Sequence, residues 1–258
     1  MFRSRLWTVA VAFIALLSPL QADAQEKPTS LEVYPAEVHI NTIRDRQSFV
    51  VQVAYPNGLT RDVTKEAKLT LSDATKVKLA GNVLHPVADG EIQLTVEFEG
   101  LSKMIPIKIE QATADRDVSF KLDIMPIFMK ANCNTGSCHG AARGKDGFRL
   151  SLFGFDPDGD QFRIARELPG RRINLALPEE SLLLTKSVGS VPHTGGKRFG
   201  TDSEDYGTML RWLKAGGNND QGEVPKVLSV ELYPPTAVLD GADTTQQLTA
   251  RAKNARLA

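Results

Sequence analysis

The sequence predicts a multidomain protein in which an all-β segment is followed by a small all-α segment and then by the start of a second β segment. Three observations support this fold class. Apolar residues alternate with polar ones between positions 30 and 111, they take helical spacing between 118 and 220, and part of the first segment is repeated at 226–258. The 258 residues are enough for roughly two domains. Because 31 basic and 31 acidic residues balance, the composition excludes the basic surplus typical of nucleic-acid-binding proteins.

Residues 1–24 have the pattern of an export signal peptide. Arg3 and Arg5 precede an apolar run at positions 6–17, and Ala22-Asp23-Ala24 has the small-x-small form of a signal-peptidase site. An uncleaved membrane anchor is the alternative, but the run is shorter than the roughly 20 residues that span a bilayer. We therefore expect a periplasmic, extracellular or cell-surface protein with no transmembrane span after signal cleavage.

Residues 30–111 are expected to form a small β-sandwich of short strands. The run Phe49-Val50-Val51-Gln52-Val53-Ala54-Tyr55 reads as a half-buried strand, and Pro56-Asn57-Gly58 after it reads as a turn. The run Tyr55-Pro56-Asn57-Gly58-Leu59-Thr60-Arg61-Asp62-Val63-Thr64 resembles the Tyr-x-x-Gly-x-x-Arg-Asp-Val-Thr pattern of bacterial immunoglobulin-like domains of group 2. The resemblance implies a non-catalytic spacer or adhesion module, whose partners would be cell-surface or carbohydrate groups.

The opening strand of this segment returns near the end of the chain. Leu31-Glu32-Val33-Tyr34-Pro35 is matched by Val230-Glu231-Leu232-Tyr233-Pro234, and Gln47-Ser48-Phe49 is matched by Gln246-Gln247-Leu248. The second copy stops after about two or three of the roughly seven strands of such a sandwich. Residues 226–258 are thus expected to be an incomplete second immunoglobulin-like domain, and the chain the front end of a longer protein or a truncated reading frame.

Residues 118–220 change to helical spacing. The expected elements are a helix at 120–132 with Asp123 as its cap, a short helix at 178–184 that starts with a proline, and a last helix capped by Ser203 or Asp202 and ended by Gly216-Gly217. The Gly-, Asp- and Arg-rich stretch at 144–172 is expected to be mostly loop.

Cys133, Cys138 and His139 are the residues with a recognisable chemistry. Covalent attachment of haem c needs two thiols that add to the porphyrin vinyl groups and an imidazole beside the second thiol that binds the iron. The usual spacing is Cys-x-x-Cys-His, whereas four residues separate the cysteines here, a spacing that some multihaem cytochromes use. A longer loop reaches both vinyl groups if it bulges, which Asn134 and Gly136 favour. The motif predicts one haem c, with His139 as the proximal iron ligand.

Three alternatives use the same residues. A Cys133–Cys138 disulfide would close a small loop, which export permits. Zinc binding by the two thiols and His139 lacks an evident fourth ligand. A redox-active thiol pair usually has the Cys-x-x-Cys spacing beside a βαβ unit, which the sequence lacks.

The surroundings of the motif favour haem. Residues 120–217 resemble the cytochrome c-like domains found in large exported proteins of planctomycete bacteria, which often carry immunoglobulin-like repeats as well. The resemblance rests on Asp123-Ile124-Met125-Pro126-Ile127, Cys138-His139-Gly140, Pro178-Glu179-Glu180-Ser181-Leu182-Leu183 and Leu210-Arg211-Trp212-Leu213-Lys214-Ala215-Gly216. It implies a small class I cytochrome c-like helical domain, and the order of segments matches over the whole mature chain.

His193 is the candidate distal ligand of the haem iron. The related domains usually offer a methionine in a Met-Pro pair before the last helix, and here that place reads Ser190-Val191-Pro192-His193. Valine cannot bind iron, whereas His193 can, and Gly195-Gly196 would let the backbone approach the porphyrin. Met209 is the competitor, but its place on the last helix suits core packing. Replacing methionine by histidine should lower the reduction potential.

The remaining polar residues have simpler interpretations. His39 and His85 are expected to be surface or turn histidines. A calcium loop would use Asp156, Asp158, Asp160 and Glu167, but Gln161 stands where that loop requires glycine, so a polar turn is preferred. The basic residues that either pair with haem propionates or are simply solvated are Arg171, Arg172, Lys197 and Arg198.

The leading hypothesis is haem binding and electron transfer by an exported monohaem cytochrome c domain between immunoglobulin-like modules. Since no acid–base pair or nucleophilic triad is recognisable, independent catalysis is not expected. One alternative is a non-haem structural or adhesive cell-surface protein with a Cys133–Cys138 disulfide. Another is the electron-input part of a larger enzyme. The sequence does not specify the redox protein that would be the partner.

Overall fold

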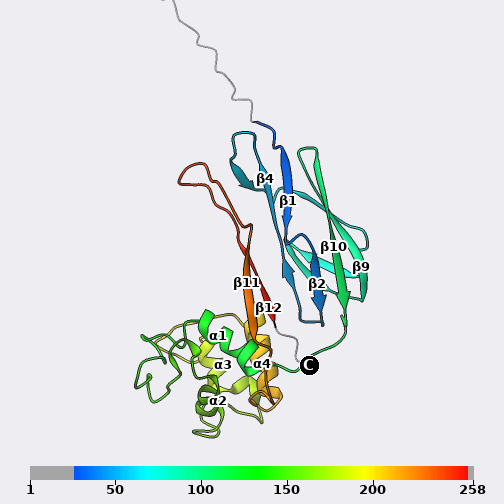
Figure 1. Cartoon of the computed structure of the whole chain (residues 1–258). Coiled ribbons are helices and arrows are strands. Elements are labelled where there is room, and N and C mark those ends of the chain that lie inside the picture. Colours follow the sequence, from blue (N-terminus) through cyan, green and yellow to red (C-terminus); the bar gives the residue numbers. More distant parts are fainter. Residues whose placement is uncertain (1–25, 255–258) are drawn as a thin grey trace, which may run out of the picture.

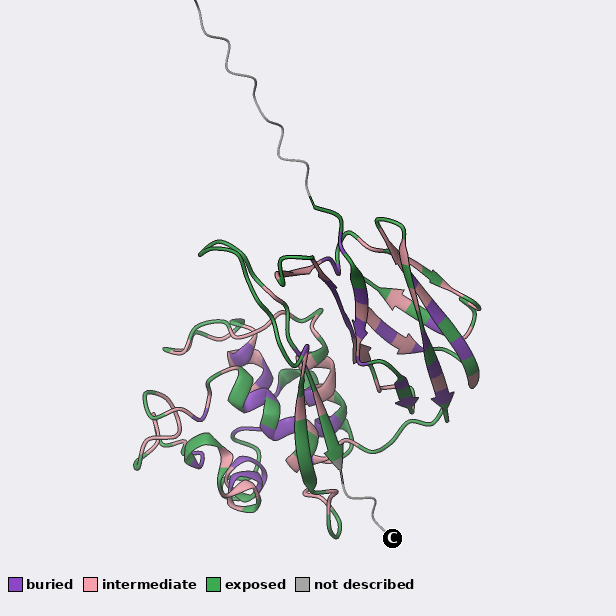
Figure 2. Ribbon diagram, turned by 45° about the horizontal axis from the view of Figure 1, so that its top comes forward, coloured by how far each residue is buried: buried purple, intermediate pink, exposed green. Residues whose placement is uncertain are grey.

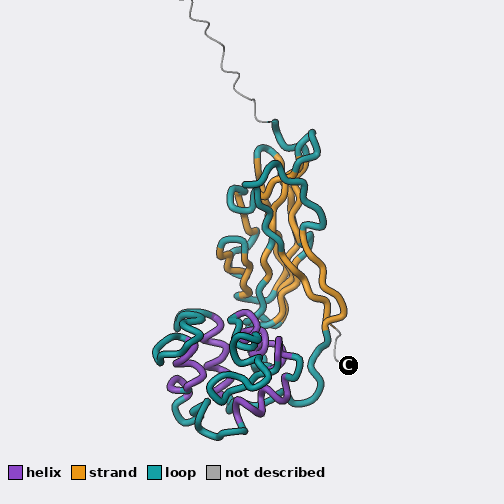
Figure 3. Tube along the Cα trace, turned by 90° about the vertical axis from the view of Figure 1, so that its left-hand side faces the viewer, coloured by secondary structure: helices purple, strands orange, loops and turns teal. Residues whose placement is uncertain are grey.

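The computed structural model describes residues 26–254, which form a β-rich structure with a few short helices (Figure 1). Strands occupy the range from Ser30 to Glu110, helices the range from Phe120 to Lys214, and two further strands the range from Val227 to Asn254. Figure 3 shows the helices gathered at one end of the molecule and the strands at the other. The export signal expected at residues 1–24 lies outside the described residues. Within the described part, no helix is long and apolar enough to cross a membrane.

The strands of the first range form three sheets. The first has the order β1-β4-β5, with β1 at Ser30–Tyr34, β4 at Val50–Ala54 and β5 at Thr60–Asp62. The second has the order β2-β10-β9-β6, with β2 at Val38–Asn41, β10 at Leu101–Glu110, β9 at Gly90–Phe98 and β6 at Lys68–Leu71. The third has the order β3-β8-β7, with β3 at Gln47–Ser48, β8 at Val83–Pro86 and β7 at Val77–Ala80. Paired strands are antiparallel except β2 and β10, which run parallel.

One apolar core is built from the inner faces of these strands (Figure 2). On β10, Ile105, Ile107 and Ile109 are buried while the residues between them are not, which is the alternation of a strand with one face in the core. Val33 of β1 enters the same core. Burial of each such side chain contributes about 1.5–3 kcal/mol, so the alternation of the sequence is sufficient to specify which face turns inward.

Strand β4 departs from the expected half-buried alternation, because residues 50–53 are all buried. Its outer face is covered by a segment from the far end of the chain. The side chain of Gln52 donates through Nε2 to the carbonyl oxygen of Thr236 and to Oε1 of Gln246, both at 3.1 Å. The partners lie 184 and 194 residues away, so the local pattern could not indicate this burial.

The repeated segment contributes an antiparallel strand pair, β11 at Val227–Tyr233 and β12 at Thr249–Asn254. Tyr34 and Tyr233, which correspond to each other in the repeat, stack with ring centroids 5.9 Å apart. The core positions of the two copies differ sharply: Val33 is 1% exposed, whereas its counterpart Leu232 is 58% exposed. Among the described residues, the second copy therefore has a strand pair whose core face is uncovered.

The first helical segment is a turn of π-helix, η1 at Phe120–Ile124, that continues into α1 at Met125–Lys130. Its cap is Ser119, whose Oγ accepts from the backbone N–H of Leu122 at 3.0 Å. The expectation that Asp123 caps this helix was wrong in detail. Asp123 instead reaches back and accepts from the backbone N–H of Ser119 at 2.8 Å, while Ser119 Oγ accepts from Leu122, an arrangement similar to a capping box.

A helix also forms inside the stretch that was expected to be mostly loop. After a short 3-10 turn, η2 at Leu152–Gly154, helix α2 spans Pro157–Ala165. Asp156 caps it by accepting from the backbone N–H of Gly159 at 3.1 Å, and Pro157 takes the first helical position. The prediction of a polar turn was therefore wrong, because Asp156-Pro157 is a helix start.

The carboxylates of the calcium alternative diverge. Asp158 pairs with Lys121 at 2.9 Å on the surface. Asp160 is fully buried and accepts from the backbone N–H of Ser151 at 2.6 Å and from its Oγ at 2.5 Å. Asp158 and Asp160 therefore have different protein partners, whereas Asp156 and Asp160 share Arg163.

The last two helices agree with the sequence in part. The expected helix at 178–184 is two pieces, η3 at Pro178–Glu180 and α3 at Leu182–Ser187, separated by the extended backbone of Ser181. Helix α4 spans Glu204–Lys214, and its cap is Ser203, whose Oγ accepts from the backbone N–H of Tyr206 at 3.2 Å. Gly216 and Gly217 end it with φ of 96° and 62°, as predicted. A second apolar core joins these helices around Trp212.

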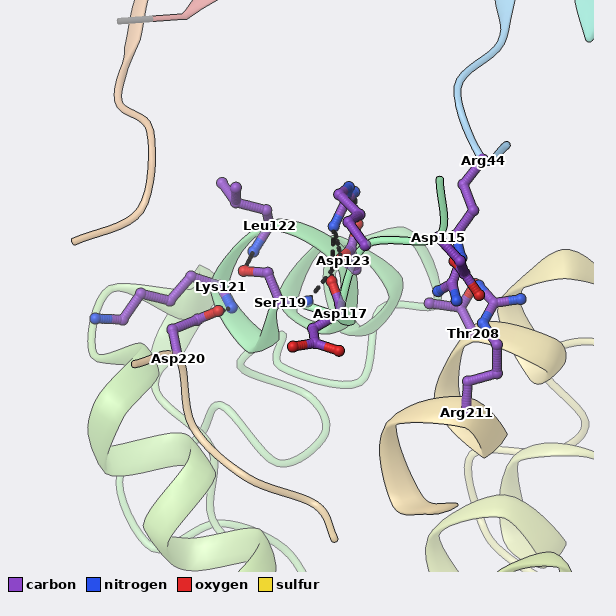
Figure 4. A network of polar contacts seen from close by, with 11 residues as sticks. Arg44, Asp115, Asp117, Ser119, Lys121, Leu122, Asp123, Thr208, Arg211 and Asp220 are labelled. Atoms are coloured by element: carbon purple, nitrogen blue, oxygen red, sulfur yellow. Dashed lines mark hydrogen bonds and ion pairs between the residues drawn. The ribbon is translucent and has the colours of Figure 1, made fainter. Parts of the chain in front are cut away.

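Ion pairs line the junction between the β part and the helices (Figure 4). Arg116 donates from both terminal nitrogens to the two carboxylate oxygens of Asp123, each at 2.6 Å. Arg44, which follows β2, pairs with Asp115, and Arg211 of α4 lies beside them. Asp123, whose carboxylate accepts from the backbone N–H of Ser119, is thus also paired with Arg116 in the segment that follows β10.

Candidate functional site

Two imidazoles lie together in one pocket. The ring centroids of His139 and His193 are 6.3 Å apart and the ring planes differ by 6°. The Nδ1 of His139 is 3.0 Å from the carbonyl oxygen of Phe148, and the Nδ1 of His193 is 3.2 Å from that of Gly196. Since a carbonyl oxygen only accepts, both Nδ1 atoms carry the proton and both Nε2 lone pairs remain free. These are the tautomers that a pair of metal-binding histidines needs.

The separation of the rings suits a single shared metal ion. A metal–imidazole bond is about 2 Å long, and a ring nitrogen lies about 1 Å from its ring centre. Two imidazoles on opposite sides of one ion have centroids about 6 Å apart. The observed separation is 6.3 Å, but the rings are stacked, so their Nε2 atoms would have to turn toward a shared ion. Burial lowers the pKa of His139, an effect that the hydrogen bond to Phe148 opposes and the neighbouring His193 reinforces. The neutral, ligating form of His139 is thereby favoured.

The backbone of the cysteine loop accommodates the long spacing. In a helical turn of Cys-x-x-Cys-His, the histidine N–H would donate to the carbonyl of the first cysteine, four residues back. Here the N–H of His139 donates to the carbonyl of Cys133, six residues back, at 3.0 Å. The loop therefore closes at the same point as the shorter motif, and the extra residues form the expected bulge. The left-handed residue that precedes it is Asn132, with φ of 57°, rather than Gly136.

Cys133 and Cys138 are both free thiols, each partly exposed. Burial raises the pKa of Cys133 to about 11; nearby Arg198 opposes this shift and Cys138 adds to it. Reactive redox thiols have a lowered pKa, so the environment of Cys133 does not favour the redox-thiol alternative. The thiol of Cys133 lines the same pocket as the two imidazoles.

The pocket between these groups has a volume of about 90 Å³ and is partly open to solvent. This is smaller than the roughly 300–1,000 Å³ typical of cofactor sites, so a bound cofactor would have to extend beyond the pocket as it stands. Its lining residues are of two kinds. The apolar ones include Phe128, Phe148, Leu150, Leu182 and Leu183, and the charged ones are the basic Lys145, Arg171, Arg172 and Lys186 and the acidic Asp146. An apolar, flat group with negatively charged substituents, as haem is, fits this distribution.

The basic residues expected near the propionates separate in the structure. Arg171 and Arg172 line the pocket, but Lys197 and Arg198 are not among its lining residues. Arg198 instead lies 3.9 Å from the sulfur of Cys138, and its Nε is buried with no hydrogen-bond partner. Sequence reasoning missed Lys145 and Lys186, because their positions depend on how the loop and α3 pack.

A glycine-rich turn presents the carbonyl oxygen of Phe148 to His139. Gly144 has φ of 66°, and a Cβ there would lie 2.2 Å from that oxygen. Gly147 has φ of 74° and open space around it. Phe148 was also missed by sequence reasoning, although Gly144-Lys145-Asp146-Gly147 is a turn signal that precedes it.

Gly195 has a different role from the one expected. A Cβ on Gly195 would lie 2.3 Å from the His193 ring, so this glycine leaves room for the imidazole itself. Gly196 accepts the hydrogen bond from His193, as described above. Both glycines therefore orient the histidine, whereas the sequence indicated an approach of backbone to porphyrin.

The other candidate residues lie away from the pocket. Met209 is fully buried in the helical core, and His39 is exposed on β2. His85 on β8 lines a cleft beside Arg44. Across residues 26–254, no three side chains of the types His, Cys, Asp and Glu gather closely enough to hold a metal ion. The zinc alternative thus gains no support from the described residues.

No protein-family model and no curated protein matches the chain. Among solved structures, it is similar to domains 4 and 5 of the S-layer protein SbsC, with 13% sequence identity. The similarity covers 34% of this chain and 54% of that one, with a TM-score of 0.29. This chain therefore spans about half the length of that structure, and a likeness at this TM-score supports no conclusion about fold or function.

Proposed function

We propose that the protein is an exported monohaem c-type cytochrome that transfers electrons, with bacterial immunoglobulin-like modules of group 2 as spacers around a planctomycete-type cytochrome c-like domain. The observation that carries the proposal is the imidazole pair of His139 and His193, 6.3 Å apart in a pocket that also contains the Cys133 thiol. Periplasmic or cell-surface localisation follows from the signal expected at residues 1–24.

Cys133 and Cys138 would attach the cofactor. Each thiol adds across one vinyl double bond: the sulfur bonds to the carbon next to the porphyrin ring, and the thiol hydrogen goes to the outer carbon. The addition needs no oxidant, and it leaves two thioethers in place of two thiols. The absence of a disulfide between the two cysteines and the place of Cys133 in the pocket support this role.

His139 and His193 would hold the iron through their Nε2 atoms. The carbonyl oxygens of Phe148 and Gly196 keep both rings in the required tautomer. A covalently bound haem supplies one-electron transfer between ferric and ferrous iron. With both histidines bound to the iron, no site would remain for oxygen or peroxide, and the partner would be another redox protein.

The test is maturation of the full chain in a bacterium that carries a cytochrome c maturation system. We expect one haem per chain that resists acid–acetone extraction and gives a pyridine haemochrome spectrum. Cys133→Ala with Cys138→Ala should lose the covalent haem. His193→Ala should turn a low-spin spectrum into a high-spin one, and His193→Met, the matched control, should stay low-spin at a higher reduction potential.

Absence of covalent haem in the matured wild-type protein would overturn the proposal. A Cys133–Cys138 disulfide in that same protein, seen as a loss of two hydrogens by mass spectrometry, would then support the structural or adhesive alternative. A His193→Ala spectrum identical to that of the wild type would overturn the distal assignment alone.

A further inference from the structure

Arg172 is a buried arginine beside the candidate haem site, and it is only 6% exposed. Its guanidinium carbon lies 4.7 Å from the centre of the Phe148 ring. Its two terminal nitrogens donate to the carbonyl oxygen of Arg163 at 2.6 Å and to that of Gly147 at 3.0 Å. Glu167 pairs with it at 3.0 Å. The guanidinium therefore contacts Phe148 on the ring face and holds the peptide that precedes it.

Phe148 in turn contacts His139 in two ways. Its carbonyl oxygen accepts the hydrogen bond from Nδ1 of His139, and its ring lies 4.6 Å from the imidazole with an interplanar angle of 48°. The hydrogen bond fixes one atom of the imidazole, and the ring contact restricts its rotation. Arg172, Phe148, His139 and His193 thus form one continuous series of contacts.

We infer that Arg172 is a positioning residue that sets the plane of the His139 imidazole through Phe148, and this inference rests on the proposed haem function. A lysine could not replace it, because only the planar guanidinium covers a ring and bonds two carbonyl oxygens at once. Removal of a residue that supports a ligating histidine typically lowers metal affinity or activity about 10–100-fold.

Pairing with a haem propionate, the role that sequence alone allowed, suits Arg172 less well. Its terminal nitrogens are already engaged with two carbonyl oxygens and with Glu167. Arg171, next to it and also at the pocket, is exposed and carries no such set of internal bonds among the described contacts. The two neighbouring arginines are therefore assigned different roles.

The plane of the imidazole has a direct spectroscopic signature. In ferric low-spin haem with two axial imidazoles, the angle between the ring planes controls the splitting of the iron d orbitals, and hence the spread of the g values. Near-parallel rings, as the 6° angle indicates, give a rhombic signal with three resolved g values. Rotation of one ring toward the perpendicular raises the largest g value.

The test compares the EPR spectra of four variants of the matured full chain with that of the wild type. Arg172→Met and Phe148→Leu should both raise or broaden the largest g value, and Arg172→Lys should recover only part of the wild-type signal. Arg149→Met, which removes an exposed arginine from the same segment, is the matched control and should leave the spectrum unchanged. Thermal unfolding of each variant separates a general loss of stability from a change at the iron.

Wild-type g values in Arg172→Met and Arg172→Lys, with only a lower melting temperature, would overturn the inference and leave Arg172 as a packing residue. Failure of the wild type to acquire haem would overturn the proposed function instead. In that case the apoprotein still tests the positioning role, through the hydrogen-bonded Nδ1–H of His139 in ¹⁵N NMR. Its exchange with water should be at least tenfold faster in Arg172→Met than in Arg149→Met, and equal rates would refute the role of Arg172.

Discussion

Gly144 and Gly147 offer a matched pair for testing how the turn before Phe148 serves His139. Both have a left-handed backbone, with φ of 66° and 74°. An alanine in this conformation costs about 1–2 kcal/mol, so both Gly144→Ala and Gly147→Ala should lose at least that much stability. A Cβ at position 147 meets nothing within 4 Å, whereas one at position 144 would lie 2.2 Å from the carbonyl oxygen of Phe148.

The Gly144 variant should therefore lose more. The displaced oxygen accepts from the backbone N–H of Lys145 at 2.9 Å and from Nδ1 of His139 at 3.0 Å. Each lost hydrogen bond costs about 0.5–1.5 kcal/mol, so the expected loss is about 2–5 kcal/mol for Gly144→Ala. Only this variant should also alter the haem spectrum.

Urea unfolding of the signal-free apoprotein, followed by tryptophan fluorescence, measures the difference. The sequence contains two tryptophans, Trp7 in the expected signal and Trp212 in the helical core. Fluorescence of the processed chain thus reports only the part of the fold that carries the site, and linear extrapolation gives its free energy of unfolding. Equal losses for the two variants would refute the reasoning, because they would show that the Phe148 carbonyl does not depend on Gly144.

Three further predictions concern single side chains. In the apoprotein, Cys133 should be alkylated by iodoacetamide slowly at pH 8 and much faster near pH 11, because its raised pKa of about 11 keeps the thiol protonated at pH 8. Mass spectrometry of the Cys133 peptide over time gives the alkylation rate at each pH. A rate that reaches half its maximum near pH 8.5 would contradict this prediction. Asp160→Ala should cost about 2–6 kcal/mol, since it leaves two donors of Ser151 unpaired, while Arg163 keeps its second partner, Asp156. Asp160→Asn, which keeps the shape, should cost less in the same urea assay, and the reverse order would speak against a charge-dependent role. Gly195→Ala should push the His193 ring away, because its Cβ would lie 2.3 Å from that ring; the ferrous protein should then bind carbon monoxide, and an absence of binding would show that the ring tolerates the methyl group.

Features fixed by nearby residues could be predicted from the sequence. Ser203 caps α4 and Gly216 ends it because capping and left-handed termination need only the residues at the helix end. The same chemistry was present at Asp156-Pro157, where a turn was predicted although an N-cap followed by proline also starts a helix. That error was one of interpretation, since the signal for α2 was in the sequence.

Features that depend on distant contacts could not be predicted. Arg172 and Phe148 are separated by 24 positions, and nothing in their local sequence indicates that the guanidinium covers the ring. Cys133, His139 and His193 were chosen as candidates by residue type, and the structure adds that they share one pocket. The rotation of each ring and its tautomer follow from the carbonyl oxygens of Phe148 and Gly196, which no side-chain pattern reveals.

The contact between Gln52 and the far segment has a consequence for how the chain assembles. During synthesis the first β part, which ends at Glu110, is complete about 125 residues before Thr236, an interval of about 6–25 seconds at roughly 5–20 residues per second. The outer face of β4 is bare throughout that time. The polar side chain of Gln52 keeps this exposed face hydrated. Its Nε2 later donates to the carbonyl oxygen of Thr236 and to Oε1 of Gln246. Gln52 therefore makes the exposed face of β4 less prone to associate with other chains, and later it binds the segment that covers this face.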